Sequence, residues 1–401
     1  MKALLVFLAA FAAAEGYWIA SGGADNRRPF AEEPRIARHL ALGHGFRSPM
    51  SSAADAPPTG WSPPLYPLLM AGAYKIYGED SKATLWVLGA FNCLAFALVV
   101  TCAFTLMKAA GGAAILTAVL FCLNPMLRDF VGDYWDALAG LALYFIALVL
   151  AARGGLRTRG GALLGALLGV LSLTAASYAL SYPLLVLKAG RRLVAASVLA
   201  FVLVLLPWTL RLHQVFGGAR YVRTGPQVEL WIGNQPGTNG WLSNSMLALH
   251  PYRSGAERKL LLEMGEPAYF ARAGQLFERE VTAGSFLRRS VQRFVFLFLS
   301  DPAEPTAIPL FTHKGPHAGR TLLNALVAGL GLAGFALAAR LRFKLGWLLP
   351  ASLLAVAPYF ITSASDRYAL PLRATLTMGV AFLLWAVARR LLDKAWPASN
   401  L

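Results

Sequence analysis

Acidic and basic side chains gather in one short stretch near the N-terminus, where they could move a proton beside a phosphate. The stretch is FAEEPRIARHLALGHGF, residues 30–46. A carboxylate at Glu32 or Glu33 could take a proton from a hydroxyl group, and Arg35 could bind a phosphate. Pro34 suits the first turn of a helix, whose positive end attracts acids. Plain helix-terminus charges are therefore the alternative interpretation of both glutamates.

A second acidic group lies in NPMLRDFVGDYWDALAG, residues 124–140. It contains Asp129, Asp133 and Asp136, although the chain has only 20 acidic residues in all. Asp133 and Asp136 would share one helix face if the helix begins early. A helix cap at Asp136 is the simpler alternative. Three acids at one boundary favour a functional role.

Arginines in two further stretches are candidate phosphate ligands, because a guanidinium group binds phosphate oxygens in pairs. Arg211 begins RLHQVFGGARYVR, residues 211–223, and Arg367 precedes Tyr368 in SASDRYALPLR. Anchoring at the membrane interface is the alternative for such residues at span ends. Arg367 is the stronger candidate, since it occupies a short turn on the side where positive charge is normally avoided.

The composition predicts that membrane helices position these residues. The chain is 57% hydrophobic and 14% charged, which is typical of a polytopic membrane protein. The formal charge of +17 follows from basic residues at one set of span ends, so no nucleic-acid partner is expected. The three cysteines lie in apolar runs and indicate packed thiols. Ten spans are expected, at about 3–20, 82–107, 111–124, 136–152, 160–175, 177–189, 193–210, 321–339, 345–363 and 371–388.

An even number of spans places both termini on one side, and the basic residues there indicate the cytoplasm. The expected organisation is an N-terminal transmembrane module at 1–210, an extracytoplasmic insert at 211–320 and C-terminal transmembrane helices at 321–401. The module includes a first outer loop at 21–81, in which residues 63–78 would form a helix along the outer interface. The fold class is thus an all-α polytopic membrane protein with its chemistry on the extracytoplasmic face.

The order of the motifs resembles a known superfamily. RIARHLALGHGF is followed by PTGWSPPLYPLLMAGAYKIYG, PWTLRLHQVFG, LWIGNQPGTNGW and DRYALPLR. This order is similar to that of the GT-C membrane glycosyltransferases, and most similar to the bacterial relatives of protein O-mannosyltransferase and lipid A aminoarabinose transferase. The resemblance covers most of the chain and is weakest across 241–320. It implies a GT-C-like bundle of about ten transmembrane helices in the cell (inner) membrane.

The resemblance also implies an activity. A hexosyl or pentosyl group would move from a polyprenyl-phosphate donor to an extracytoplasmic acceptor, which could be a protein, a lipid or a glycan. A single displacement would invert the anomeric carbon. A divalent metal is possible, but no ligand spacing demands one.

Roles for individual residues follow from the same resemblance. The base is expected at Glu32, with Glu33 as the fallback. Many family members carry an acid slightly earlier in this loop, where DNRRPF leaves only Asp25. The other expected site residues are a second acid at Asp133 or Asp136, donor-phosphate contacts at Arg367, Arg211, Arg35 and Tyr368, and substrate contacts at His44, Trp61 and Asn234.

Two other classes of protein fit parts of the pattern. A flippase or transporter for lipid-linked sugars would need charges deep within spans, where Glu15 is the main one, and inverted repeats are not evident. A non-catalytic membrane protein could keep the fold and lose the chemistry, as the departure at DNRRPF allows.

Overall fold

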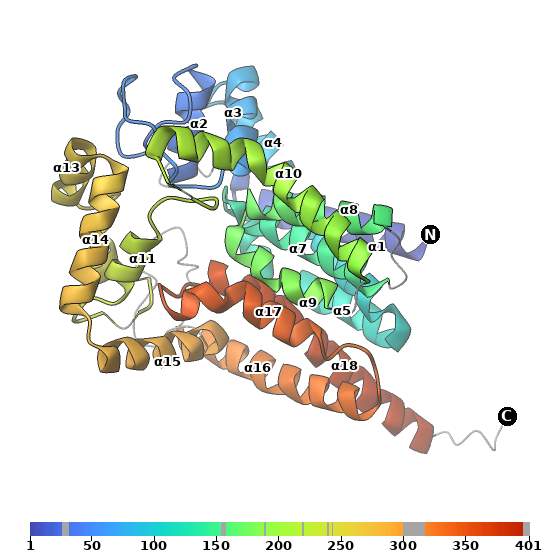
Figure 1. Cartoon of the computed structure of the whole chain (residues 1–401). Coiled ribbons are helices and arrows are strands. Elements are labelled where there is room, and N and C mark those ends of the chain that lie inside the picture. The colour runs from blue at the N-terminus through green and yellow to red at the C-terminus, as the bar shows by residue number, and fades with distance from the viewer. Residues whose placement is uncertain are drawn as a thin grey trace.

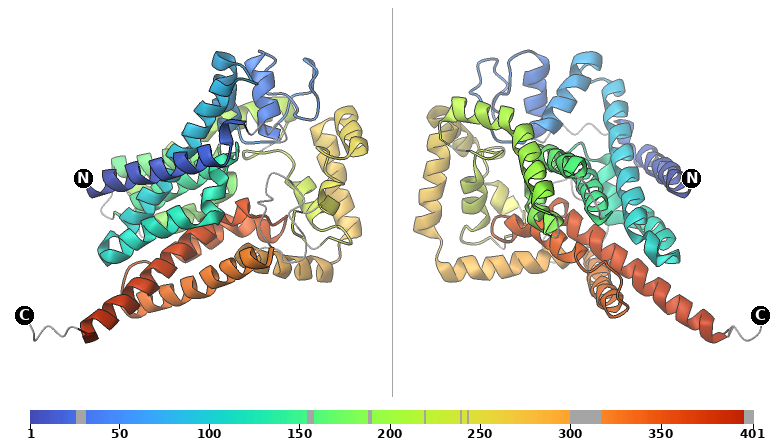
Figure 2. Two further views of the ribbon diagram at one scale, coloured as in Figure 1. Left: turned by 180° about the vertical axis from the view of Figure 1, so that it is seen from behind. Right: turned by 45° about the vertical axis from the view of Figure 1, so that its right-hand side comes forward.

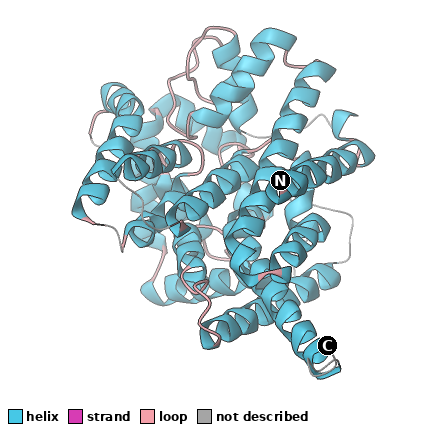
Figure 3. Cartoon of the chain, turned by 90° about the vertical axis from the view of Figure 1, so that its right-hand side faces the viewer, coloured by secondary structure: helices cyan, strands magenta, loops and turns pink. Residues whose placement is uncertain are grey.

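The structure is a computed structural model that describes residues 1–25, 32–153, 158–187, 190–218, 220–238, 240–242, 244–299 and 317–395. Within these residues every regular element is a helix, and the only pairing of extended backbone is two isolated bridges, Arg47 with Pro58 and Trp241 with Ala364. Figure 3 shows this uniformly helical architecture. Helices satisfy their own backbone hydrogen bonds, as an apolar environment requires. The expected all-α class is confirmed.

The described residues up to Phe216 form ten α-helices and four short 3-10 helices. In chain order these elements are α1 (Lys2–Ala20), η1 (Gly23–Asp25), α2 (Glu32–Ala41), α3 (Leu65–Tyr77), α4 (Lys82–Met107), η2 (Lys108–Ala110), α5 (Gly112–Leu123), α6 (Pro125–Arg128), η3 (Asp129–Gly132), α7 (Asp136–Ala152), α8 (Thr158–Ser172), η4 (Ala176–Ser181), α9 (Tyr182–Val186) and α10 (Arg191–Phe216).

The remaining elements form the insert and the C-terminal helices. They are α11 (Pro226–Gly233), α12 (Asn244–Leu247), α13 (Gly255–Met264), α14 (Glu266–Glu280), α15 (Ala283–Leu299), α16 (His317–Arg340), α17 (Leu348–Val356), η5 (Ala357–Phe360), η6 (Arg367–Ala369) and α18 (Leu370–Ala395). Figure 1 shows α11, α13 and α14 at one end of the molecule and the apolar helices at the other.

Five helical segments of the described chain are long and apolar enough to cross a membrane. They are Lys2–Ala20, Lys82–Ala110, Arg191–Phe216, Thr321–Arg340 and Arg367–Leu392. A sixth crossing is possible if Gly112–Leu123 and Pro125–Gly132, which meet at 62°, form one broken span. The other expected spans are apolar helices of 10–17 residues, shorter than the roughly 20 residues that cross a bilayer core. Each of the ten expected segments is therefore helical, and ten full crossings remain a prediction.

Close helix contacts join the membrane helices. Gly165 of α8 lies against the backbone of α10, and a Cβ there would come within 1.9 Å of the Ser197 carbonyl oxygen. In the C-terminal part, a Cβ on Gly334 of α16 would lie 1.9 Å from the Gly379 carbonyl oxygen of α18. Small residues of this kind let helix backbones approach closely in membranes. The main apolar core then joins α1, α4, α5, α7 and α8 to α17 and α18.

The first outer loop and the insert pack together. Helices α2 and α3 contact each other, and the core of the insert, formed around Trp231 and Phe270, also includes Met50 and Trp61 of the loop. The N-terminus and the last described turns of α18 lie at the end of the molecule opposite α13 and α14 (Figures 1 and 2). Loop and insert therefore form one layer at the end of the helical bundle that is remote from the termini.

Candidate functional site

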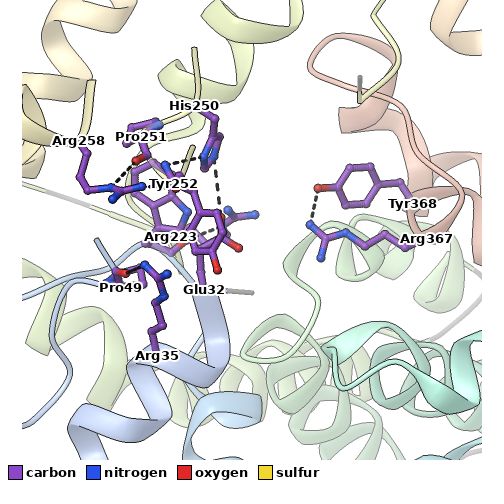
Figure 4. Close-up of polar contacts among 11 residues, drawn as sticks. Glu32, Arg35, Pro49, Arg223, His250, Pro251, Tyr252, Arg258, Arg367 and Tyr368 are labelled. Atoms are coloured by element: carbon purple, nitrogen blue, oxygen red, sulfur yellow. Dashed lines mark hydrogen bonds and ion pairs between the residues drawn. The ribbon is translucent and has the colours of Figure 1, made fainter. Parts of the chain in front are cut away.

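A cavity of about 360 Å³ lies where the first outer loop, the insert and the bundle meet. Three helix beginnings contribute to its lining: α2, α7 and the turn that starts the last span. The charged lining residues are Glu32, Glu33, Asp136, Arg223, Glu229 and Arg367, and the aromatic ones are Trp61, Tyr178, Tyr221, Tyr359 and Tyr368. Its size falls in the range of small-molecule sites. In Figure 4, Glu32 and Arg223 lie on one side and Arg367 with Tyr368 on the other.

Glu33 is the most deeply buried of the glutamates in this cavity. Its side chain lies in the first turn of α2 and is 7% exposed. Its Oε2 atom has no hydrogen-bond partner among the described residues. Burial, followed by the negative charges of Asp136 and Glu32, raises the pKa of Glu33 to about 7, although Arg367 opposes the shift. Glu33 can therefore exchange a proton near neutral pH.

Glu32 precedes it and is more accessible. Its Oε1 atom lies 3.9 Å from Nε2 of His250, a buried residue between α12 and α13. The His250 ring also meets Trp61 edge-on, with centroids 5.4 Å apart. The first outer loop and the insert therefore contact each other beside the cavity. Glu32 and Trp61 of the loop line it, and His250 of the insert contacts both.

Aromatic rings hold the Arg367 guanidinium in place. Its central carbon lies 4.1 Å from the centroid of the Trp135 ring, and its Nη2 atom donates a 2.6 Å hydrogen bond to the hydroxyl of Tyr368. Tyr368 is stacked on Tyr359 at 3.9 Å. The Nε atom has no partner among the residues that the structure describes. A cation held by ring faces keeps donors for an anionic ligand.

Arg223 is a second cation of the cavity, from the loop that precedes α11. Its Nε atom donates a 2.9 Å hydrogen bond to the backbone oxygen of Trp61. The buried carboxylate of Glu266, in the first turn of α14, supports the same region. It accepts hydrogen bonds from Thr59 Oγ1, from Gly60 N at 3.1 Å and from Thr224 Oγ1 at 2.6 Å. Glu266 therefore ties Thr59 and Gly60 of the loop to Thr224, the residue after Arg223.

Several residues expected at the site lie elsewhere. Arg211 donates to the backbone oxygens of Thr59 and Phe46, and Arg35 donates to that of Pro49. Neither arginine lines the cavity. Residues 46–60 contain no helix, so their carbonyl groups need side-chain donors. Both arginines therefore shape the first outer loop, and their expected contact with a donor phosphate stays a prediction.

The expected substrate contacts divide in the same way. Trp61 lines the cavity, whereas His44 and Asn234 do not. His44 pairs with His39, at 3.4 Å between their Nδ1 atoms. The buried amide of Asn234 donates to the Ile361 carbonyl at 2.9 Å and accepts from Arg293. These two residues stabilise the walls around the cavity.

Two of the expected acids are also placed outside the lining. Asp133 is buried, and its backbone oxygen accepts a 2.7 Å hydrogen bond from Asn92. Asp25 is exposed and pairs with Lys82 at 3.3 Å. Asp136, one turn beyond Asp133, reaches the cavity because it is the first residue of α7. The part of the chain that the structure describes contains no cluster of three or more ligands suited to a metal ion.

Sequence reasoning left several lining residues without a role. Arg223 lies in the basic stretch 211–223, so its residue type and position could have identified it as a candidate phosphate ligand. Tyr178 and Tyr359 carried no such signal, because each lies in an apolar segment. His250 lies in the part of the chain where the resemblance is weakest.

No family model matches the sequence, and no curated protein matches it. Among solved structures, the chain is similar to the crystal structure of ArnT from Cupriavidus metallidurans bound to undecaprenyl phosphate. The TM-score is 0.41 at 15% sequence identity, over 98% of this chain and 79% of that chain. At this TM-score and identity, the likeness by itself assigns no reaction to the chain.

Proposed function

We propose that this chain is a membrane glycosyltransferase that moves a sugar from a polyprenyl-phosphate donor to an acceptor hydroxyl group. One observation carries the proposal: a single cavity beside apolar helices holds the carboxylates of Glu32, Glu33 and Asp136 together with the guanidinium groups of Arg223 and Arg367. Glycosyl transfer from a lipid phosphate needs a base, a cation for the phosphate and access to the membrane.

In the proposed reaction, the Glu32 carboxylate removes the proton of the acceptor hydroxyl group. The acceptor oxygen attacks the anomeric carbon, while the bond from that carbon to the phosphate oxygen breaks. The electron pair remains on the polyprenyl phosphate, and Arg367 stabilises the charge that grows there, with Arg223 as a second donor. Attack and departure on opposite faces invert the anomeric carbon.

The two glutamates suit different tasks. Glu32 is the more accessible, as a base that meets an incoming acceptor should be. Glu33 lies deeper, and its pKa of about 7 leaves it partly protonated at neutral pH. In that form it can donate a hydrogen bond to a hydroxyl group or phosphate oxygen of the donor. Glu33 remains the fallback base if Glu32 proves dispensable.

The orientation in the membrane belongs to the same proposal. Helix α16 ends at Arg340, and the last turns of α18 contain Arg389 and Arg390. Both helix ends lie near the end of the bundle where the N-terminus is found (Figure 1). The positive-inside rule then places both termini in the cytoplasm and the cavity on the extracytoplasmic side of the cell membrane. The donor would reach the cavity laterally from the outer leaflet, and its acceptor from the aqueous phase or the membrane.

The test is a transfer assay with purified protein in nanodiscs. A panel of polyprenyl-phosphate sugars would be supplied with candidate acceptors, and release of polyprenyl phosphate would be measured. Wild type should turn over at least one donor, whereas Glu32→Gln and Arg367→Gln should lose most of the activity. Glu79→Gln is the matched control, because Glu79 pairs with Arg38 away from the cavity.

Each other outcome has a distinct meaning. Normal turnover by Glu32→Gln would move the base to Glu33 or Asp136. Movement of a lipid-linked sugar across a proteoliposome membrane, without release of polyprenyl phosphate, would replace the enzyme by a transporter. Donor binding with neither activity would indicate a non-catalytic relative.

A further inference from the structure

His250 contacts the site without lining it. The residue is 6% exposed and comes from the insert, whereas its two neighbours, Glu32 and Trp61, come from the first outer loop. Figure 4 shows its ring directed toward Glu32. A histidine with a role only within its own loop would not be expected to contact Glu32, which is more than two hundred positions away in the sequence.

The hydrogen bond on its other nitrogen defines which atom carries the proton. The backbone N–H of Tyr252 donates to Nδ1 of His250 at 3.2 Å. Nδ1 is therefore an acceptor and holds no proton. A neutral imidazole then carries its hydrogen on Nε2, the atom that lies 3.9 Å from Oε1 of Glu32. Protonation of Nδ1 would break the bond to Tyr252, so this tautomer is built into the loop.

Packing keeps the ring in this orientation. The Trp61 ring meets the imidazole at an interplanar angle of 84°, and Trp61 in turn packs against Phe270 of α14. The charged groups near this face include Glu33, beside Glu32 on α2, and Arg35, which lies over the Tyr252 ring at 4.6 Å. They also include Arg223, whose Nε atom donates to the Trp61 carbonyl, and Arg258, whose guanidinium donates to the Pro251 and Tyr252 carbonyls. Arg35 points its guanidinium at the Pro49 carbonyl, so it does not replace His250 as a donor to Glu32.

We infer that His250 is a positioning residue whose Nε2–H group orients the Glu32 carboxylate toward the acceptor. The inference rests on the proposed function. The separation of 3.9 Å is longer than a hydrogen bond, so the inference includes closure of this contact to hydrogen-bond distance when an acceptor hydroxyl binds. The insert then contributes to the reaction, because its His250 orients the Glu32 carboxylate of the first outer loop.

Two substitutions distinguish the orienting role of His250 from a role in packing alone. His250→Phe keeps a flat ring against Trp61 but removes the N–H donor. His250→Gln loses the ring but can place an amide N–H near the position of Nε2. Orientation by the donor predicts that His250→Phe lowers kcat by about 10- to 100-fold, the range for partners that orient the ligands of catalytic metals. KM should change little, and His250→Gln should recover a large part of kcat.

A packing role predicts the opposite order, with His250→Phe more active than His250→Gln, and that order would overturn the inference. A double-mutant cycle adds a second criterion. In a Glu32→Gln background, His250→Phe should cost little further activity. An undiminished additional loss would also overturn it, while leaving the glycosyltransferase proposal intact.

A readout that needs no turnover keeps the two proposals separable. Protein labelled with 15N-histidine would be compared by NMR with and without Glu32→Gln, and His250→Gln would identify the His250 signals. The expected result is a proton on Nε2, with the resonance of that nitrogen shifted by Glu32→Gln. A proton on Nδ1, or an Nε2 resonance that Glu32→Gln does not shift, would refute the contact. This holds even if the chain has no transferase activity.

Discussion

Replacing Glu33 by glutamine should make the protein more stable at alkaline pH, although it alters a residue of the proposed site. In the folded state, burial first and the charges of Asp136 and Glu32 second raise the Glu33 pKa from 4.5 to about 7. The folded protein therefore holds this proton more tightly than the unfolded chain does. Stability falls as the pH rises from about 4.5 to about 7, and the full penalty remains above that range.

The size of the penalty follows from the shift. Each pKa unit corresponds to about 1.4 kcal/mol, so the Glu33 carboxylate costs on the order of 3 kcal/mol at pH 8 relative to acid pH. Glutamine has nearly the same shape and cannot ionise. Glu33→Gln should remove most of this cost at pH 8 and little of it at pH 5.

The assay is the thermal unfolding midpoint of wild type and Glu33→Gln in the same detergent, measured at pH 5, 6, 7 and 8. The midpoint of the variant relative to wild type should rise steadily with pH. Glu263→Gln is the control, since Glu263 is exposed and pairs with Lys259 within α13. A difference that stays constant, or that shrinks as the pH rises, would refute the reasoning and mean that Arg367 holds Glu33 as an anion.

Three further predictions test the site and its supports. Arg367→Lys keeps the charge but loses the planar stack on an indole ring, so turnover should fall about 10-fold or more in the transfer assay; unchanged turnover would contradict this. Arg293→Met should lower stability by about 3 kcal/mol or more, because it strips donors from several buried backbone oxygens, whereas Arg288→Met at the exposed neighbour should not. Gly165→Ala should lower the melting midpoint through its clash with α10, while Gly16→Ala, which has open space, should be tolerated.

The arrangement of helices followed from the sequence because apolar length and flanking charge are local properties. The ten expected segments are helical, and the stretch that begins at Glu32 forms α2. The number of complete membrane crossings could be predicted less well from the sequence. Helices such as α5 and α9 are short, and their depth depends on neighbours that no hydropathy window records.

Part of the site could also be predicted from the sequence. Glu32 and Glu33 lie in the first outer loop, and Asp136 and Arg367 lie at the ends of apolar segments. All four fall on one expected side of the membrane, which favoured their meeting, and one cavity contains them. The expected phosphate contacts of Arg211 and Arg35 stay a prediction, because a guanidinium group binds a backbone carbonyl as readily as a phosphate. Which ligand it meets depends on the path of residues 46–60, and no local pattern encodes that path.

The cavity takes its charges from distant parts of the chain, and that order matters while the protein is being made. Glu32, Glu33 and Asp136 emerge first, Arg223 follows, and Arg367 emerges more than half a chain length after Asp136. At about 5–20 residues per second, the ribosome needs on the order of ten seconds or more for that interval. Throughout it, three carboxylates share one region without their final cation. Insertion of the last span therefore completes the charge balance of the cavity, and a chain interrupted before Arg367 holds only Arg223 of the two cations that line it.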